Sequence, residues 1–276
     1  MTNELKLVTW NVLAAPWASP IWYPAEMDST VLDRQTRTAL VAKALRNFDP
    51  DVICLQETTP PDLAYILRAL GEGYAFHFAS NSKELWANWG ASETPWEPNG
   101  TAVILRSDRF IESASGEIEL GPHGNVATWV RLVDVSNGKQ IQIVSAHLDS
   151  DDGDRRRSEL PALFDAISTS GAVVIAGDYN EDTISTGFGE PFFERGFADV
   201  FALLDNRLPT HPYFRPGDDL ADRATIDHIL VREVHAVTCD VIDVGIWSLE
   251  PAEKRMEELL RRTGSDHLAL TVSLTI

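Results

Sequence analysis

The stretch DVICLQE at residues 51–57 is a short apolar run that ends in an amide and a carboxylate. Val52 to Leu55 are small or aliphatic residues, and such a run predicts a buried strand. Asp49-Pro50 precedes the run and ends the helical pattern upstream, because the residue before a proline disfavours the helical conformation. The stretch therefore predicts a buried strand that carries an ionisable side chain, Glu57, at its end.

Strand-like and helix-like segments alternate on both sides of this run. Helices are expected at 31–48, 62–70 and 156–167. Strands are expected at 5–13, 52–55, 74–79, 101–105, 127–135, 141–146, 172–176, 225–231, 237–244 and 268–274. Asn137-Gly138 predicts a hairpin turn between two of these strands. Hairpins mixed with single helices predict an α/β protein with a core of two mixed sheets, helices outside, and one domain over residues 1–276.

Composition and charge limit the partners. The 276 residues include 23 Lys plus Arg and 42 Asp plus Glu, which gives a formal net charge of −19. Extended binding of duplex nucleic acid depends on many cationic contacts, so we do not expect it. The apolar runs fall short of the ~20 residues that span a bilayer. Cys54 and Cys239 are too few for a disulfide framework, and the N-terminal residues lack a signal-peptide pattern, so we expect a cytoplasmic protein of open oligomeric state.

Two predicted loops, 14–26 and 80–98, are rich in aromatic residues. Together they carry five of the eight tryptophans, namely Trp17, Trp22, Trp86, Trp89 and Trp96. Two interpretations stay open for them. The rings pack the loops onto the body of the protein, or they form an apolar platform on which part of a substrate stacks.

Single polar residues end six of the apolar segments. They are Asn11, Glu57, His147, Asp178 with Asn180, Asp227, and Asp266 with His267. Each alone has an ordinary explanation as a cap, a turn former or a satisfied core residue. Strand ends at one sheet edge converge, however, and buried charge is costly unless it is paired or metal-bound. The set therefore predicts a cleft for a phosphate group and a hard cation, with the oxygen ligands that Mg²⁺ prefers.

These motifs, in this order and across essentially the whole chain, resemble the endonuclease/exonuclease/phosphatase superfamily, which has the deoxyribonuclease I-like fold. The resemblance implies a four-layer α/β sandwich, in which two mixed β-sheets pack face to face with helices outside. It also implies a phosphodiesterase or phosphomonoesterase that depends on Mg²⁺ or Mn²⁺. The run at 51–57, Trp22-Tyr23-Pro24, Arg34 and the RATID sequence at 223–227 are similar to the nocturnin and deadenylase-like branch.

The resemblance implies a role for each matching residue. Three residues would form the metal site: Asn11, Glu57 and Asp266. Five would form the catalytic set: His147, Asp178, Asn180, Asp227 and His267. Four would contact the substrate: Asn99, Arg223, Trp22 and Trp96.

Within the catalytic set, His147 would stabilise the charge that develops on the phosphate. Asp178 would orient or deprotonate the attacking water, and Asn180 would bond to the phosphate. Asp227 would hold His267 in its useful tautomer through a hydrogen bond.

Some residues depart from the family pattern or fall outside it. Asp149 stands where deadenylase-type enzymes often carry a basic residue, and Arg155 to Arg157 either compensate for it or form an exposed helix start. Strand alternation predicts that His228 faces away from Asp227. The four other histidines are expected at the surface or in packing roles: His77, His123, His211 and His235.

The leading hypothesis is a Mg²⁺-dependent phosphoesterase that acts by in-line attack of water. Its preferred substrate is a single-stranded nucleic-acid end or a nucleotide, because stacking on tryptophan needs little positive charge. One alternative is a small-molecule or lipid-headgroup phosphoesterase of the phosphoinositide or sphingomyelin type. The other is a non-catalytic binding protein on the same fold, which the complete set of metal, acid and imidazole positions disfavours.

Overall fold

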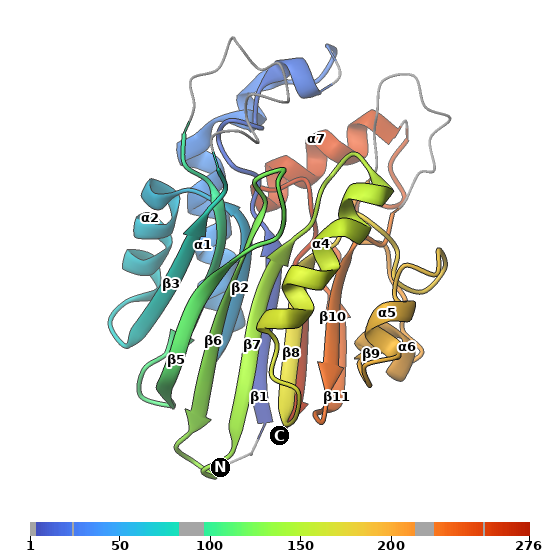
Figure 1. Cartoon of the computed structure of the whole chain (residues 1–276). Helices are drawn as coiled ribbons and strands as arrows, with labels where there is room; N and C mark the ends of the chain where they lie inside the picture. The colour runs from blue at the N-terminus through green and yellow to red at the C-terminus, as the bar shows by residue number, and fades with distance from the viewer. Residues whose placement is uncertain (1–3, 24, 83–96, 213–223, 251) are drawn as a thin grey trace.

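The computed structural model describes residues 4–23, 25–82, 97–212, 224–250 and 252–276, and its core is a pair of facing six-stranded sheets (Figure 1). The first sheet has the strand order β11 (His235–Val241), β12 (Leu270–Thr275), β1 (Glu4–Asn11), β2 (Val52–Thr58), β4 (Gly100–Arg106) and β3 (Tyr74–Ser80). The second has the order β5 (Phe110–Glu119), β6 (Val126–Asp134), β7 (Gln140–His147), β8 (Ala172–Asp178), β10 (Asp227–Arg232) and β9 (Ala198–Asp199). Both sheets mix parallel and antiparallel neighbours, which confirms the predicted fold class.

Helices cover the outer face of each sheet. The described helices are η1 (Pro20–Trp22), η2 (Ser29–Leu32), α1 (Arg34–Phe48), α2 (Pro60–Leu70), α4 (Gly153–Ala166), α5 (Glu190–Phe193), α6 (Val200–Leu203) and α7 (Ala252–Thr263). Val41 of α1 and Ile66 of α2 pack with Ile53 of the first sheet. Leu163 of α4 packs with Ile175 of the second sheet. The arrangement is a four-layer sandwich of helix, sheet, sheet and helix.

Alternation along the strands divides the apolar side chains between these layers. In β1, Leu5 and Leu7 face the second sheet and join the central core, whereas Val8 and Trp10 join the core under the helices. Val174 of β8 meets the central core from the opposite side. Strands buried on both faces read as nearly continuous apolar runs, which is why the sequence identified them.

Most of the expected elements are present, with bounds that shift by a few residues. The hairpin turn at Asn137-Gly138 is also confirmed, with Gly138 at φ 72° between β6 and β7. Two substantial elements, β5 and α7, were not expected. β5 exposes much of its length, and α7 is a charged helix with one apolar face, so neither contains the long apolar run that marks the other elements.

No helix in the described ranges is long and apolar enough to cross a bilayer.

Candidate active site

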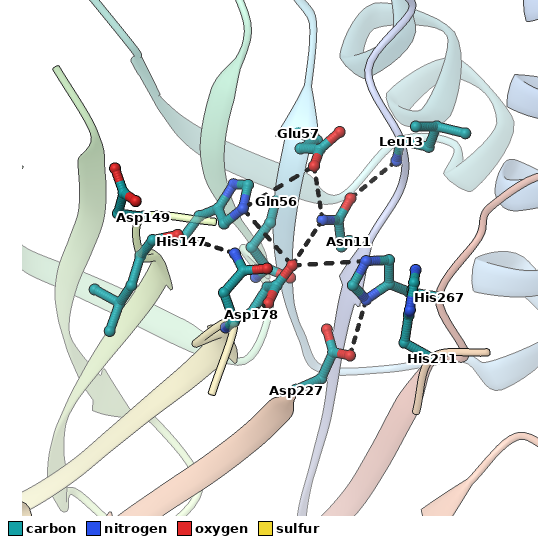
Figure 2. Close-up of polar contacts among 12 residues, drawn as sticks. Asn11, Leu13, Gln56, Glu57, His147, Asp149, Asp178, His211, Asp227 and His267 are labelled. Atoms are coloured by element: carbon teal, nitrogen blue, oxygen red, sulfur yellow. Dashed lines mark hydrogen bonds and ion pairs between the residues drawn. The ribbon is translucent and has the colours of Figure 1, made fainter. Parts of the chain in front are cut away.

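The polar residues at the strand ends gather at one edge of the sandwich, between the two sheets (Figure 2). β7 runs parallel to β8 and β10 runs antiparallel to it, so the end of β7, the end of β8 and the start of β10 lie side by side. This register places His147 beside Asp178 and Asp178 beside Asp227. From the first sheet, Asn11 ends β1 and His267 lies just before β12, the neighbour of β1.

A buried polar layer separates this cluster from the apolar core below it. The Nε2 group of Gln56 donates hydrogen bonds to Oγ1 of Thr9, at 3.1 Å, and to Oγ of Ser145, also at 3.1 Å. The Ser145 hydroxyl in turn donates to the carbonyl of Leu55. The layer joins β1, β2 and β7 across the two sheets, and satisfied buried networks of this kind rigidify their surroundings.

Glu57 reaches the cluster through an irregularity in β2. Period-two alternation places Gln56 between the sheets and would place Glu57 on the helix side. The pairing of β2 with β4 shifts register between Leu55 and Thr58, and Glu57 has a φ of 52°. A bulge of this kind re-aims a side chain, and here it turns the carboxylate back toward Asn11.

Left-handed backbone recurs at two neighbouring strand ends. Leu13, after β1, has a φ of 55°, and Asn180, after β8, has a φ of 50°. For residues other than glycine this conformation costs roughly 1–3 kcal/mol and is typical of functional sites. The chain thus bends at three adjacent strand ends to present the side chains of the cluster.

Asn11 joins the carboxylates of the cluster. Its Nδ2 group donates to Oε1 of Glu57 and to Oδ2 of Asp178, both at 3.0 Å. Its Oδ1 accepts from the backbone N–H of Leu13 at 3.0 Å, which fixes the orientation of the amide. Asn11 therefore offers its nitrogen to the cluster and would act on a metal by holding Glu57 rather than through its own oxygen.

Two imidazoles flank the carboxylate of Asp178 (Figure 2). Its Oδ2 lies 3.6 Å from Nε2 of His147 and 3.6 Å from Nε2 of His267. The Nδ1 of His267 contacts Oδ2 of Asp227 at 2.9 Å, as the resemblance implied. Nε2 of His147 lies 4.0 Å from Oε1 of Glu57.

Burial and these charges set the protonation states. Burial alone would lower the pKa of His267, but the carboxylates of Asp227 and Asp178 raise it well above the ordinary histidine value. Burial alone would raise the pKa of Asp178, but His267 and His147 bring it below its usual value. For Asp227 burial prevails, and its pKa is raised. The site therefore favours a protonated His267 beside an ionised Asp178.

Asp266 forms a second part of the site with Tyr23, to which the motifs gave no role, and with His211, which the motifs did not include. The hydroxyl of Tyr23 donates to Oδ2 of Asp266 at 3.0 Å, and Nε2 of His211 lies 4.0 Å from the same oxygen. The His211 ring is 4.5 Å from the His267 ring, between centroids. Burial, followed by the charge on His267, lowers the pKa of His211 to about 4, so this imidazole is neutral at neutral pH.

His211 was expected at the surface or in a packing role, and the structure places it in contact with His267 at the cavity beside the cluster. Its backbone forms an isolated antiparallel bridge with Ala224. His228, in contrast, faces away from the cluster as predicted, and its Nδ1 contacts Oδ2 of the buried Asp199 at 2.7 Å.

The donor set fits a divalent cation. Oδ1 of Asp227 and Oδ1 of Asp266 are buried, and neither has a hydrogen-bond partner among the described residues. Burial raises the pKa of the Glu57 carboxyl, which indicates that its charge lacks full compensation. Unsatisfied buried acceptors are costly, and a hard cation with oxygen ligands would satisfy them.

Two sets of side chains bring their ligand atoms within 4.8 Å of one another. One set is Asp178, Asp227 and His267, and the other is His211, Asp266 and His267. Both sets contain oxygen and imidazole donors, and they share His267.

A cavity of about 200 Å³ opens beside the cluster, and its two sides differ in character. The polar side is formed by Glu57, His147, Asp149, Ser150, His211 and Asp266, with Asn81 and Asn125. The apolar side is formed by Leu13, Trp17, Trp22, Tyr23 and Met256, whereas Leu148, between His147 and Asp149 in the chain, belongs to the apolar cluster of the second sheet. Trp22 of the predicted substrate contacts thus lies at the cavity, together with Trp17.

The remaining predicted site residues have different positions. The Nδ2 of Asn180 donates to the carbonyl of Leu148, and its backbone N–H donates to Oδ1 of Asp178. Asn99 is fully buried and bonds to Asn81 and to the carbonyl of Glu97, so it supports a cavity residue rather than lining the cavity itself. Trp96 and Arg223 lie outside the described residues, as do Trp86 and Trp89.

Hydrogen bonds and ion pairs within the acidic and arginine-rich segment after His147 fix its conformation. Oδ1 of Asp149 accepts from the backbone N–H groups of Asp151 and Asp152. Arg155 lies 3.8 Å from Oδ2 of Asp149, whereas Arg156 is buried and pairs with Glu181. Arg155 and Arg156 therefore differ in their contacts, and Arg156 is a structural residue of α4.

The fold and the site together define a phosphoesterase of the α/β-sandwich type. The chain belongs to the Endonuclease/Exonuclease/phosphatase family, whose model matches residues 8–267. This match confirms the resemblance that the motifs indicated. No curated protein matches the sequence significantly.

Solved structures with the same fold include proteins with diverse substrates. The human nocturnin catalytic domain with bound sulfate has 19% sequence identity and a TM-score of 0.70, over 99% of this chain and 95% of nocturnin. D. rerio TDP2 in complex with a single-stranded DNA product has 19% identity and a TM-score of 0.67, over all of both chains. A mannosyl-6-phosphatase of Bacteroides thetaiotaomicron has 17% identity and a TM-score of 0.67, over 99% of this chain and 100% of that one. At these identities the likeness concerns the fold.

Proposed function

We propose that this protein is a Mg²⁺-dependent phosphoesterase, with Mn²⁺ as a possible substitute, that hydrolyses a phosphate ester by in-line attack of water. The observation that carries the proposal is the placement of the buried Asp178 between two imidazoles, His147 and His267, beside a cavity that His147, Glu57 and Asp266 line. The cluster combines a base, positive charge and uncompensated carboxylates, as phosphoryl transfer requires.

In this reaction each residue of the cluster would have a distinct role. Glu57 and Asp266 would hold the metal ion, which when bound supplies Lewis-acid stabilisation of the phosphate charge. Asp178, with its lowered pKa, is ionised and would accept the proton of the attacking water. His147 and the protonated His267 would stabilise the charge on the phosphate oxygens, and Asp227 fixes the orientation of His267. Asn180, whose backbone N–H donates to Oδ1 of Asp178, would bond to the phosphate.

We further propose a nucleotide or a single-stranded nucleic-acid end as the preferred substrate. The tryptophans at the cavity support a ring-containing substrate, and TDP2, which has the same fold, was solved with a single-stranded DNA product. A phosphosugar or lipid headgroup is the second candidate, and the mannosyl-6-phosphatase of the same fold favours it. Arg223 and Trp96 stay predicted substrate contacts.

The test is hydrolysis measured by mass spectrometry on an oligonucleotide, a mononucleotide, a phosphoinositide and sphingomyelin, with Mg²⁺ and with EDTA. We expect metal-dependent product from a nucleotide substrate, and Glu57→Gln and His267→Ala should each lower the rate by about two orders of magnitude or more. Glu119→Gln, an exposed change on β5, is the matched control.

Thermal unfolding with and without Mg²⁺ provides a second measurement. The wild type should gain stability from Mg²⁺, because a ligand that binds only the folded state stabilises it, and Glu57→Gln should lose most of this gain. Full turnover in EDTA would reject the metal mechanism. Mg²⁺ stabilisation without any turnover would support the non-catalytic binding protein.

A further inference from the structure

We propose that the apolar side of the cavity is a subsite for one flat, uncharged ring, and that the substrate carries this ring next to a single phosphate group. Neither a polyphosphate nor a phosphate without a ring would satisfy both sides of the cavity. The inference rests on the proposed function for the position of the phosphate, at the cluster around Asp178.

The residues of the apolar side, which we call the apolar wall, contact one another and the apolar cluster beneath them, and this order favours ring binding. Trp17 and Trp22 contact each other edge to face, with their ring centroids 6.2 Å apart and an interplanar angle of 61°. Met256 of α7 packs in one apolar cluster with Leu13, and Trp17 and Tyr23 pack against that cluster. A wall already ordered in this way loses little conformational entropy when a ring binds to it.

Tyr23 makes the two sides of the cavity contiguous. Its ring belongs to the apolar wall, while its hydroxyl donates to Oδ2 of Asp266 on the polar side. A ligand that touches both sides therefore needs only a short link between its ring and its phosphate. The cavity volume of about 200 Å³ is below the ~300–1,000 Å³ of sites for drug-sized ligands, so it suits one such unit.

The charge of the lining argues against several phosphates. None of the described residues that line the cavity is Lys or Arg, whereas Glu57, Asp149 and Asp266 all face it. Nη1 of the nearby Arg37 is directed at backbone carbonyls, including those of Leu13 and Gly264 at 2.9 Å. Polyphosphates are usually held by guanidinium or ammonium groups. Among the described lining residues, each phosphate beyond the one at the metal site would meet carboxylates instead.

The test compares four ligands by calorimetry in the presence of Mg²⁺, with the full chain carrying Asp178→Asn to prevent turnover. The ligands are thymidine 5′-monophosphate, ribose 5-phosphate, thymidine and thymidine 5′-triphosphate. We expect the monophosphate to bind about tenfold more tightly than ribose 5-phosphate, because stacking of one base contributes roughly 1–3 kcal/mol. We expect the same margin over thymidine, which lacks the phosphate group, and over the triphosphate, whose additional phosphates would meet carboxylates.

Trp22→Ala should weaken binding of the monophosphate about tenfold and leave ribose 5-phosphate unchanged. Trp129→Ala, at a half-buried tryptophan of β6 that stacks with Arg131, is the matched control and should change neither. If Trp22→Ala does not fold, Trp22→Leu keeps apolar bulk without a flat ring face. Tighter binding of the triphosphate, equal weakening of both ligands, or no binding at all would overturn the inference.

Hydrolysis by the unsubstituted protein separates this inference from the proposed function. Metal-dependent turnover without a preference for a ring or for one phosphate would remove the subsite and leave the function intact. The expected binding order without turnover of any ester would keep the subsite and reject the function.

Discussion

At the scale of single residues, Tyr23 and Asn11 act through the carboxylates that they hold. The Tyr23 hydroxyl bonds to Asp266, and the Asn11 amide bonds to Glu57 and Asp178. If Glu57 and Asp266 hold the metal ion as proposed, Tyr23 and Asn11 would tune the metal affinity without touching the metal, because they orient its ligands. Tyr23 comes from an aromatic loop, and the Trp22-Tyr23-Pro24 run that resembles the nocturnin-like branch gave it no role of its own.

Tyr23→Phe should therefore weaken Mg²⁺ binding about tenfold, because loss of an outer hydrogen-bond partner costs roughly 10–100-fold in metal affinity. The ring is kept, so the apolar wall and the stability of the protein should change little. Mg²⁺ titration followed by calorimetry measures the effect, and Tyr65→Phe on the exposed face of α2 is the control. An unchanged Mg²⁺ affinity would show that Tyr23 has no orienting role.

At the scale of elements, the parallel pairing of β7 and β8 sets the spacing between His147 and Asp178. Gly177 allows this pairing, because a Cβ atom there would lie 1.9 Å from the carbonyl oxygen of Ala146. Its φ of 156° is also one that residues with side chains rarely adopt. The glycine before Asp178 thus belongs to the geometry of the site.

Gly177→Ala should lower the free energy of unfolding by at least about 3 kcal/mol, because the backbone oxygen of Ala146 cannot move without separating the strands. Urea unfolding measures the change. Gly138→Ala has positive-φ strain but meets nothing within 4 Å, so it should cost only about 1 kcal/mol. Equal losses in the two variants would mean that close strand contact is not the cause.

Some elements of the fold could be predicted from the sequence and others could not. Apolar runs located β2, β7 and β8 because both faces of these strands are buried. β5 and α7 each have an exposed face and no such run, and they were missed. The polar strand ends predicted the cluster. The bulge that redirects Glu57, the loop that carries His211 and the bond from Tyr23 depend on tertiary contacts that no local pattern encodes.

At the scale of the whole molecule, one buried carboxyl links folding stability to pH. Glu159 of α4 is fully buried and accepts hydrogen bonds from Nδ2 of Asn125, at 2.7 Å, and from the backbone N–H of Asp149, at 2.9 Å. Both donors belong to residues that line the cavity. Burial raises the pKa of Glu159 from 4.5 to about 7.

Because the folded pKa is raised, the folded protein keeps the proton over a range in which the unfolded chain has released it. The contribution of Glu159 to stability should thus fall as pH rises from about 4.5 to about 7, by about 3 kcal/mol in all, and stay constant at higher pH. Glu159→Gln removes this titration. Urea unfolding of both proteins between pH 4.5 and 9 should show a stability difference that changes only within that window, and a constant difference would contradict the assignment.

The strand order β11-β12-β1 has a consequence for biosynthesis. The strand at residues 4–11 pairs with the strand at residues 270–275, which is made more than 250 residues later, and this pairing brings Asn11 and His267 together. Contacts so distant in sequence form late in folding. A nascent chain that has not yet released residues 267–275 therefore lacks the His267 imidazole of the cluster, and the proposed hydrolysis should begin only once β12 has emerged and joined β1 to β11.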